Sequence, residues 1–212
     1  MIHMYLSRIQ LSLNERSTMR ALADLKFFHE ALENCFPGDR PGNMWRIDKL
    51  KENLYILVLS EEKADFSPFC RQFSPSEDSW ETKDYDPLLG RLKNGSIWRF
   101  RLSANPTYYA KAKEPITVRG KVRAHKTPEH QREWLIKQSQ KNGFQLATDG
   151  FEITENKWLR FHKSGGNVVT ILSVTYEGLL MITDVELFQK ALTNGIGRGK
   201  AYGMGLLTIM SV

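Results

Sequence analysis

Cysteine and long apolar runs are both scarce in this chain. Its 212 residues include two cysteines, Cys35 and Cys70, which form neither a disulfide framework nor a metal-binding set. The first residues, MIHMYLSRIQ, lack the hydrophobic segment of a signal peptide, and no apolar stretch is long enough to span a membrane. We therefore expect a reduced, cytoplasmic protein that does not associate with a membrane.

The patterns of the common catalytic centres are also missing. The five histidines are scattered, and no acidic cluster has the spacing of metal ligands, so we expect no zinc or two-metal site and no cofactor. There is no Gly-x-Ser-x-Gly motif and no evident pairing of a cysteine with a histidine. If this chain cleaves a phosphodiester, it would have to do so without metal, by attack of a ribose 2′-OH, and hence on RNA.

Glycine, in contrast, is concentrated near the C-terminus. Two cations and one aromatic residue are interleaved with five glycines there: Gly195, Gly197, Gly199, Gly203 and Gly205, with Arg198, Lys200 and Tyr202. Open backbone N–H groups beside positive charge suit a phosphate. Ala201 after the Gly-Lys pair excludes a P-loop, and the strand that follows excludes a dinucleotide-binding loop. The alternative, a flexible tail, is disfavoured by the apolar run from Leu206 to Val212.

The excess of positive over negative charge is confined to one block of the chain. Residues 1–90 contain 11 Lys/Arg and 15 Asp/Glu, residues 91–141 contain 13 and 3, and residues 142–212 contain 6 of each. The central balance of +10 indicates a surface that binds a polyanion. A merely solvated lysine-rich surface is one alternative. A metabolic enzyme for a small anion is another, but it would not explain a basic block of this length.

Hydrophobic periodicity predicts the order β-α-β-β-α-β in the first half. We expect strands at 4–13, 44–49, 54–60 and 80–85, with a short helix at 65–73. A longer amphipathic helix at 17–36, with Ser17 as its N-cap, places Leu22, Leu25, Phe28, Leu32 and Phe36 on one face. This element order is typical of a ferredoxin-like or RRM-like domain.

The second half repeats this order after a linker at 88–95. We expect strands at 97–104, 144–154, 158–163, 168–176 and 206–212, helices at 128–142 and 184–193, and a long loop or ragged hairpin at 107–127. Residues 178–182 either continue the strand at 168–176 or pair with it. The strands at 158–163 and 168–176 form a hairpin. We predict an α+β protein with tandem ferredoxin-like domains at 1–87 and 96–212, the second with an inserted basic β-hairpin.

His29 is the candidate catalytic residue. It lies at the edge of the predicted apolar stripe, and Lys26 lies three residues before it on the same edge. A histidine at such a boundary is often structural, yet its proton moves near neutral pH. Beside a cation it could deprotonate a ribose 2′-OH or protonate a leaving 5′-oxygen. The group that assists it stays open among Lys26, Arg198, Lys200 and Tyr202.

The candidate RNA-binding residues are cations of the basic block, the hairpin and the glycine-rich segment. They are Arg99, Arg101, Lys111, Lys113, Arg119, Lys121, Arg123, Lys126, Arg160, His162, Lys163, Arg198 and Lys200. Arg99 and Arg101 share one face of their strand, opposite the apolar residues. The basic hairpin at 160–163 can lie along an RNA groove and contact mainly backbone and shape. A solvated hairpin tip is the alternative.

Several stretches resemble one known family. Residues 195–207 (GIGRGKAYGMGLL) are similar to the glycine-rich loop of the CRISPR repeat-associated (RAMP) proteins. Residues 4–7 (MYLS), 28–37 (FHEALENCFP) and 100–106 (FRLSANP) together resemble the CasE subunit. That subunit is the CRISPR-RNA-processing endoribonuclease of the type I-E Cascade complex. The resemblance covers nearly the whole chain.

The resemblance implies a fold, an activity and partners. It implies tandem ferredoxin-like domains and metal-independent cleavage at the 3′ base of the CRISPR repeat hairpin, leaving a 2′,3′-cyclic phosphate and a 5′-OH. It implies that His29 is the acid/base, and that Lys26 stands where members often carry tyrosine. The implied partners are the repeat RNA hairpin and other Cascade subunits. A non-catalytic RAMP-type RNA-binding subunit is the alternative.

Overall fold

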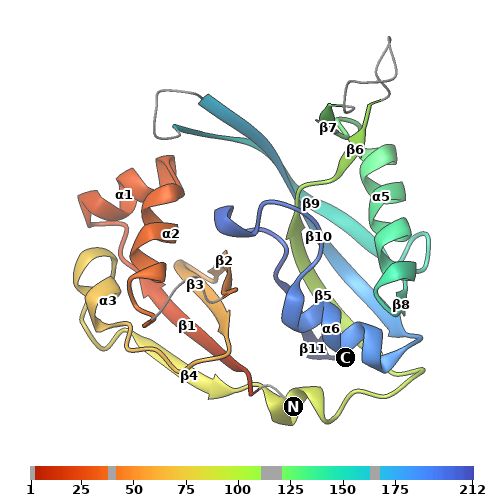
Figure 1. Ribbon diagram of the computed structural model, residues 1–212, viewed down its shortest axis with the longest axis horizontal. Helices are drawn as coiled ribbons and strands as arrows, with labels where there is room; N and C mark the ends of the chain where they lie inside the picture. The colour runs from red at the N-terminus through yellow and green to blue at the C-terminus, as the bar shows by residue number, and fades with distance from the viewer. Residues whose placement is uncertain (1–2, 38–41, 111–120, 163–167) are drawn as a thin grey trace.

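The structure is a computed structural model that describes residues 3–37, 42–110, 121–162 and 168–212 (Figure 1). Its strands form two large antiparallel sheets, one from each half of the chain, and a separate two-stranded sheet. Within the described residues, no helix is both long and apolar enough to cross a membrane.

The first half builds a four-stranded sheet. Its elements are β1 (Tyr5–Leu11), α1 (Arg16–Ala23), α2 (Lys26–Glu33), β2 (Met44–Leu50), β3 (Asn53–Ser60), α3 (Ser67–Phe73) and β4 (Trp80–Asp84). The spatial order is β2-β3-β1-β4, with all neighbours antiparallel. Alternate residues of β1 are buried, because one face of the sheet packs on the helices. Phe28 of α2 and Phe73 of α3 meet edge to face there, 5.1 Å apart between ring centroids.

The second half builds the other large sheet. After the short α4 (Asp86–Leu89) come β5 (Ile97–Ala104), β6 (Thr107–Tyr109), β7 (Val122–Ala124), α5 (Pro128–Lys141), β8 (Phe144–Gln145), β9 (Phe151–His162), β10 (Val168–Ile182), α6 (Val185–Asn194) and β11 (Leu207–Ser211). The sheet order is β11-β5-β10-β8, and β9 also pairs with β10. The β9–β10 hairpin extends from the sheet toward α1 and α2 (Figure 1). β6 and β7 pair with each other.

Both halves therefore have the predicted architecture. In each, the fourth strand lies beside the first, then the third, then the second, which is the arrangement of a ferredoxin-like domain. The α+β class and the tandem ferredoxin-like fold are confirmed. The predicted strand at 97–104 has the observed bounds of β5, with Arg99 exposed and Trp98, Phe100 and Leu102 buried. The domain boundaries at 87 and 96 stay a prediction.

Three local predictions are wrong. The helix expected at 17–36 is two helices, because Asp24 has extended dihedral angles and its carboxylate accepts the backbone N–H of Lys26. Ser17 is not an N-cap: α1 begins after Glu15, and the Ser17 hydroxyl donates to the Gln72 carbonyl. The strands expected at 144–154 and 158–163 are instead the short β8 and the continuous twelve-residue β9.

The two halves meet where β2 contacts the glycine-rich segment. This segment includes the 3₁₀ turn η1 (Lys200–Tyr202), which packs against both β2 and α2. Gly203 has φ +75°, and a Cβ there would lie 2.8 Å from the Trp45 ring. Glycine is required at this position because any side chain would strain the backbone and collide with Trp45. The glycine-rich segment thus packs closely against β2 at the junction of the two halves.

Candidate functional site

His29 lies in the middle of α2 with its side chain 32% exposed. Its Nδ1 atom is buried and has no hydrogen-bond partner. The nearest carboxylate oxygen in an ion-pair contact is Oε1 of Glu33, one turn later, at 3.9 Å. A shift of about 1 Å would bring this carboxylate into hydrogen-bonding distance of Nδ1. The imidazole is therefore accessible, with one nitrogen enclosed and close to an acceptor that could fix its tautomer.

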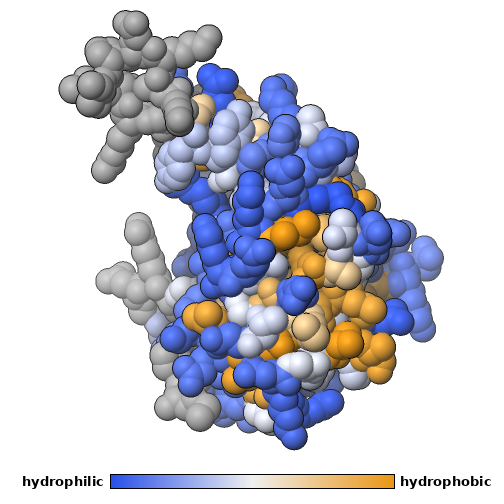
Figure 2. Space-filling view, turned by 90° about the vertical axis from the view of Figure 1, so that its right-hand side faces the viewer, coloured by the Kyte–Doolittle hydropathy of each residue, from blue (hydrophilic) through white to orange (hydrophobic). Residues whose placement is uncertain are grey.

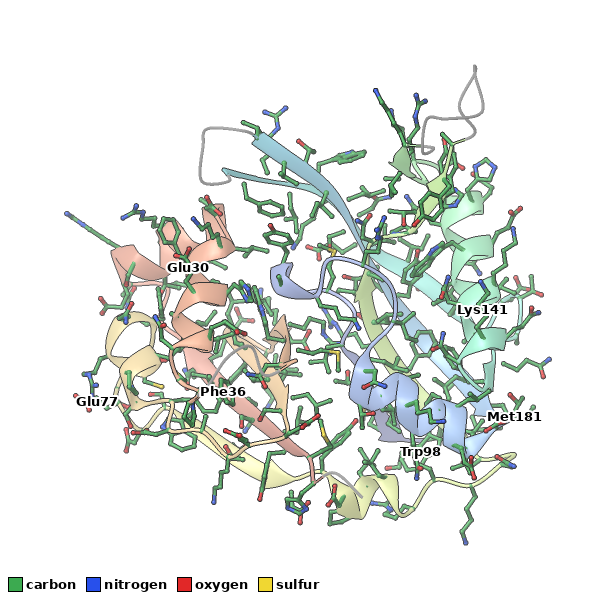
Figure 3. All side chains as sticks on the ribbon, in the orientation of Figure 1. Glu30, Phe36, Glu77, Trp98, Lys141 and Met181 are labelled. Carbon is green, nitrogen blue, oxygen red and sulfur yellow. The ribbon has the colours of Figure 1, made fainter. Side chains whose placement is uncertain are left out.

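Lys26, the predicted helper, begins α2 and contacts a different residue. Its Nζ lies 3.1 Å from Oε1 of Glu30, which is labelled on α2 in Figure 3. The pair is exposed, so its net contribution to stability is small and its side chains can separate at little cost. Lys26 is therefore on the same helix as His29, but its charge is directed toward Glu30 in this structure.

The glycine-rich segment places η1, with the aromatic Tyr202 and the cationic Lys200, against α2. Tyr202 stacks on Phe161 of β9, with ring centroids 4.2 Å apart and planes 3° from parallel. Lys200 donates from Nζ to the Asn194 carbonyl, and the exposed Arg198 has its guanidinium 5.9 Å from the centroid of the Tyr109 ring. The stack joins the turn end of the β9–β10 hairpin to η1, and η1 contacts the helix that carries His29. These contacts connect the β9–β10 hairpin to α2 through the glycine-rich segment.

A buried ion-pair network, which we call the Arg46 network, fixes the halves together beneath this region. Arg46 of β2 binds both carboxylate oxygens of Asp48, at 2.8 and 2.7 Å. It also donates to the carbonyls of Arg101 and Leu206 and to the Thr208 hydroxyl, at 2.9, 2.7 and 2.7 Å. These three acceptors belong to the second half, so one guanidinium bridges both sheets.

Arg101, a predicted RNA-binding residue, is part of this network. Its Nε lies 3.2 Å from Oδ1 of Asp48, and its Nη1 lies 3.1 Å from Oε1 of Glu177. The Nε contact has the distance of an ion pair without hydrogen-bond alignment, since this atom has no hydrogen-bond partner. Two protein carboxylates thus balance the charge of Arg101. The sequence did not indicate this role, because Asp48 belongs to a strand of the other half.

The remaining predicted cations lie on several surfaces. Arg99 of β5, Arg123 of β7 and Arg160 of β9 are exposed, as are Lys121, Lys126 and Arg198. His162 is the last residue of β9 and pairs with Val168 through the backbone. Lys111, Lys113, Arg119 and Lys163 lie outside the described residues. The structure thus brings Lys200, as part of η1, to the junction beside α2 and places Arg198 beside Tyr109 of β6.

A cavity of about 500 Å³ opens between the two halves. Residues from α1, β2 and β3 line it on one side, and residues from β5, β9, β10 and the glycine-rich segment line it on the other. Trp45, Arg46, Arg101, Tyr202 and Gly203 are among them. The same residues that join the halves therefore also form the walls of the cleft.

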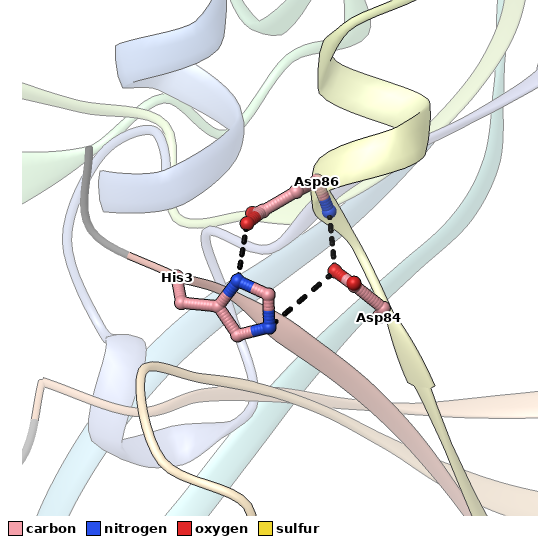
Figure 4. A group of neighbouring side chains, drawn as sticks. All are labelled: His3, Asp84 and Asp86. Carbon is pink, nitrogen blue, oxygen red and sulfur yellow. Dashed lines mark hydrogen bonds and ion pairs between the residues drawn. The ribbon is translucent and has the colours of Figure 1, made fainter.

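The structure also brings together three residues that the sequence left scattered. His3 Nδ1 contacts Oδ2 of Asp86, and His3 Nε2 lies 3.7 Å from Oδ1 of Asp84 (Figure 4). These atoms are close enough together to be considered as metal ligands. However, each ring nitrogen faces its own carboxylate, so contacts within the protein already occupy both nitrogens. We assign the cluster to an ion-paired histidine that holds the start of β1 near α4.

A fold of two ferredoxin-like units, with an accessible histidine on the helix that contacts the glycine-rich segment, is typical of RNA-binding and RNA-processing proteins. Comparison with known proteins agrees with this class. The model of the CRISPR associated protein family matches residues 4–210. The chain belongs to this family.

Individual relatives cover almost the whole chain. The CRISPR-associated endoribonuclease Cse3 of Thermus thermophilus is 28% identical, over 97% of this chain and 99% of the relative. The structure of Thermus thermophilus Cse3 bound to an RNA representing a pre-cleavage complex superposes with a TM-score of 0.82 at 27% identity, covering 98% and 99% of the two chains. Cas6e of Escherichia coli shares the fold, with a TM-score of 0.69 at 22% identity over 98% and 100% of the chains.

Proposed function

We propose that this chain is an endoribonuclease that binds the hairpin of a CRISPR repeat RNA and cleaves the precursor RNA at the 3′ base of the hairpin. The 2′-OH attacks the adjacent phosphorus, the bond to the 5′-oxygen breaks, and the products carry a 2′,3′-cyclic phosphate and a 5′-OH. The observation that carries the proposal is the accessible His29, placed beside the glycine-rich segment in a chain that matches an endoribonuclease over its full length.

In this proposal His29 moves the proton. A small movement would bring the Glu33 carboxylate into hydrogen-bonding distance of Nδ1. Glu33 can then accept a hydrogen bond from Nδ1–H, which fixes the tautomer and leaves Nε2 to face the RNA. As a base, the imidazole takes the proton of the 2′-OH; as an acid, the imidazolium gives a proton to the leaving 5′-oxygen. Cations must then balance the phosphorane, and we propose Lys200 and Arg198, with Lys26 once its pair with Glu30 separates.

The RNA stem lies, in this proposal, along the β9–β10 hairpin and the glycine-rich segment. Arg160 and His162 are on β9, and Lys163 follows them in sequence. Exposed arginines on a two-stranded ribbon can follow a groove and contact phosphates. The stacking of Tyr202 on Phe161 supports the ribbon near its turn end. Arg101 is left out of this surface because Asp48 and Glu177 already balance its charge.

We further propose that the protein works in the cytoplasm and keeps its cleaved product within a Cascade complex. Related chains have been solved as part of a CRISPR RNA-guided surveillance complex, with a TM-score of 0.71 at 24% identity for one of them. A protein that holds its product makes one cut per molecule, so the amount of cleaved RNA should equal the amount of enzyme.

The decisive test uses the purified protein in EDTA with a repeat hairpin RNA. The same RNA with a single 2′-deoxy nucleotide just upstream of the cut is the matched substrate. We expect cleavage of the first RNA and none of the second, since the second lacks the nucleophile. A requirement for Mg²⁺ would refute the mechanism, and tight binding without cleavage of either RNA would indicate a non-catalytic RNA-binding subunit.

His29→Ala tests the assignment of the acid/base. Loss of positioned proton transfer should lower the cleavage rate by about 10²–10⁴-fold and leave RNA binding nearly unchanged. His3→Ala is the matched control, because its imidazole is ion-paired near α4 and takes no part in the proposed chemistry. Cleavage by the His29 variant at the wild-type rate would show that the site is elsewhere.

A further inference from the structure

A second aromatic and basic hollow lies away from His29, at the base of the β6–β7 hairpin. It has a volume of about 770 Å³ and is lined by Tyr108, Arg123, Ala124, His125, Lys126, Thr127 and His130. None of these lining residues is acidic. The hollow is bounded by β6, β7 and the first turn of α5, near the top of Figure 1. Figure 2 shows mostly hydrophilic residues in the corresponding upper part of the surface.

Three rings in this hollow form a short stack that is open at its ends. Tyr108 and His125 are 4.8 Å apart between ring centroids and tilted by 35°, and His125 and His130 are 5.7 Å apart and 29° from parallel. Tyr108 is 41% exposed, and His130 is exposed as well. A flat ring of suitable size could therefore extend the stack at either end, which is how proteins hold unpaired bases.

Hydrogen bonds hold the stack in place before any ligand binds. The Gln131 side chain donates to the His125 carbonyl at 2.9 Å, and the backbone N–H of His125 donates to the Pro106 carbonyl at 2.9 Å. The Thr127 hydroxyl lies 3.0 Å from Nδ1 of His130. Burial is the main cause that lowers the pKa of His125, and the nearby His130 and Lys137 lower it further. The central ring is therefore neutral at neutral pH and stacks without a charge to solvate.

Exposed cations lie at the margin of the stack. Arg123 and Lys126 flank the rings on the β7 side, where they could contact the phosphates on either side of a stacked base. The other face of the β6 strand carries Tyr109, whose ring lies under the Arg198 guanidinium of the glycine-rich segment. The hollow and Arg198, which belongs to the surface proposed for the RNA stem, thus lie on opposite faces of the same small hairpin.

We infer that this hollow binds single-stranded RNA, holding an unpaired nucleotide that flanks the repeat stem. The inference rests on the proposed function for the source of the RNA, but not for the chemistry of binding. The base would stack on Tyr108 or His130, and its phosphates would contact Arg123 and Lys126. Such a site would add affinity and would orient the flanking strand without touching the scissile bond.

The test measures binding of three RNAs to the full-length protein by fluorescence anisotropy. The first is the blunt repeat hairpin, which ends at the base of the stem. The second is the same hairpin extended by unpaired nucleotides at both ends and made uncleavable by a 2′-deoxy nucleotide just upstream of the cut. The third is an unstructured oligonucleotide of about ten nucleotides, a length within the usual site size for single-strand binding.

The key variant is Tyr108→Ala, which removes one exposed face of the stack. Tyr108→Phe keeps the ring, and Val122→Ala removes an equally exposed apolar side chain from the same hairpin outside the lining of the hollow. Since stacking contributes about 1–3 kcal/mol per base, Tyr108→Ala should raise the Kd for the extended hairpin and for the oligonucleotide about tenfold. The Kd for the blunt hairpin should not change, and both control variants should bind like the wild type.

The failures of the two proposals can be told apart. If wild-type protein does not bind the blunt hairpin, the proposed function fails, while the oligonucleotide still tests the hollow. Equal wild-type affinity for blunt and extended hairpins would overturn the inference. So would a loss of affinity in Tyr108→Ala that is the same for all three RNAs, since that would mean the residue serves the stem or the fold.

Discussion

Replacing Arg46 by methionine tests whether the buried Arg46 network holds the two halves together. The side chain is 2% exposed and makes five hydrogen bonds, two of them to Asp48 and three to groups of the second half. Methionine has a similar length and fills the space without charge. After the substitution, Asp48 stays buried with one cation near it, Arg101 at 3.2 Å.

The expected loss of stability arises because the buried carboxylate of Asp48 loses its partner Arg46. Removing one partner of a buried ion pair typically costs about 3–5 kcal/mol, because the other charge remains buried. Arg101 still offsets part of the Asp48 charge, so we expect the lower end, about 3 kcal/mol. In a chain of this size that lowers the melting temperature by roughly 6–12 °C. Urea titration followed by tryptophan fluorescence measures the free energy of unfolding, and Trp45 reports from the junction itself.

Two further variants make the measurement decisive. Arg71→Met removes an exposed ion pair with Glu77 of similar length, 3.0 Å, and should cost less than about 1 kcal/mol. Arg46→Met combined with Asp48→Leu removes both charges and should recover most of the lost stability. If Arg46→Met costs no more than Arg71→Met, or if the double variant is no more stable than the single one, the reasoning about the buried pair is refuted.

Two other predictions concern the junction and the ring stack. Gly203→Ala should lower the free energy of unfolding by at least about 2 kcal/mol, because the new Cβ meets Trp45 at 2.8 Å and φ is +75°. Gly95→Ala, with φ +80° but nothing within 4 Å, should cost about 1 kcal/mol in the same urea titration. Equal costs of the two substitutions would contradict the close contact between Gly203 and Trp45. The folded-state pKa of His125 lies below its ordinary value of 6.5, so its contribution to stability is full above that pH and is lost as the pH falls. The melting temperature of His125→Gln should therefore fall less than that of the wild type on acidification below pH 6.5. If the melting temperatures of the two proteins fall equally with pH, the effect assigned to His125 is refuted.

The sequence predicts the strands well and the first long helix poorly. The alternation of β5 identifies its buried face, because apolar and charged residues alternate from Trp98 to Leu102. The helix at 17–36 is continuous in its apolar periodicity, so periodicity does not reveal the break at Asp24. The signal that could have found it is the aspartate itself, since its side chain caps the backbone of Lys26 and aspartate favours the start of a helix.

The site was predicted in part. The helix of His29 and the glycine-rich segment do meet, as their proposed common role requires. The role of Arg101 was not predictable, because its partners Asp48 and Glu177 come from strands far away in the sequence. The ring stack of Tyr108, His125 and His130 was also missed, since three residues with irregular spacing give no periodic signal.

The bonds between Arg46 and the last strand have a consequence for biosynthesis. A ribosome releases the first sheet long before it has made Leu206 and Thr208, which supply two of the acceptors of the Arg46 guanidinium. In a nascent chain whose first half has already folded, Arg46 of β2 therefore lacks the hydrogen-bond acceptors that the second half will supply, and Asp48 lacks its contact with Arg101. The first half thus reaches its final state only when synthesis ends. A truncation of β11 would remove hydrogen-bond acceptors of Arg46, which lies about 160 residues earlier in the sequence.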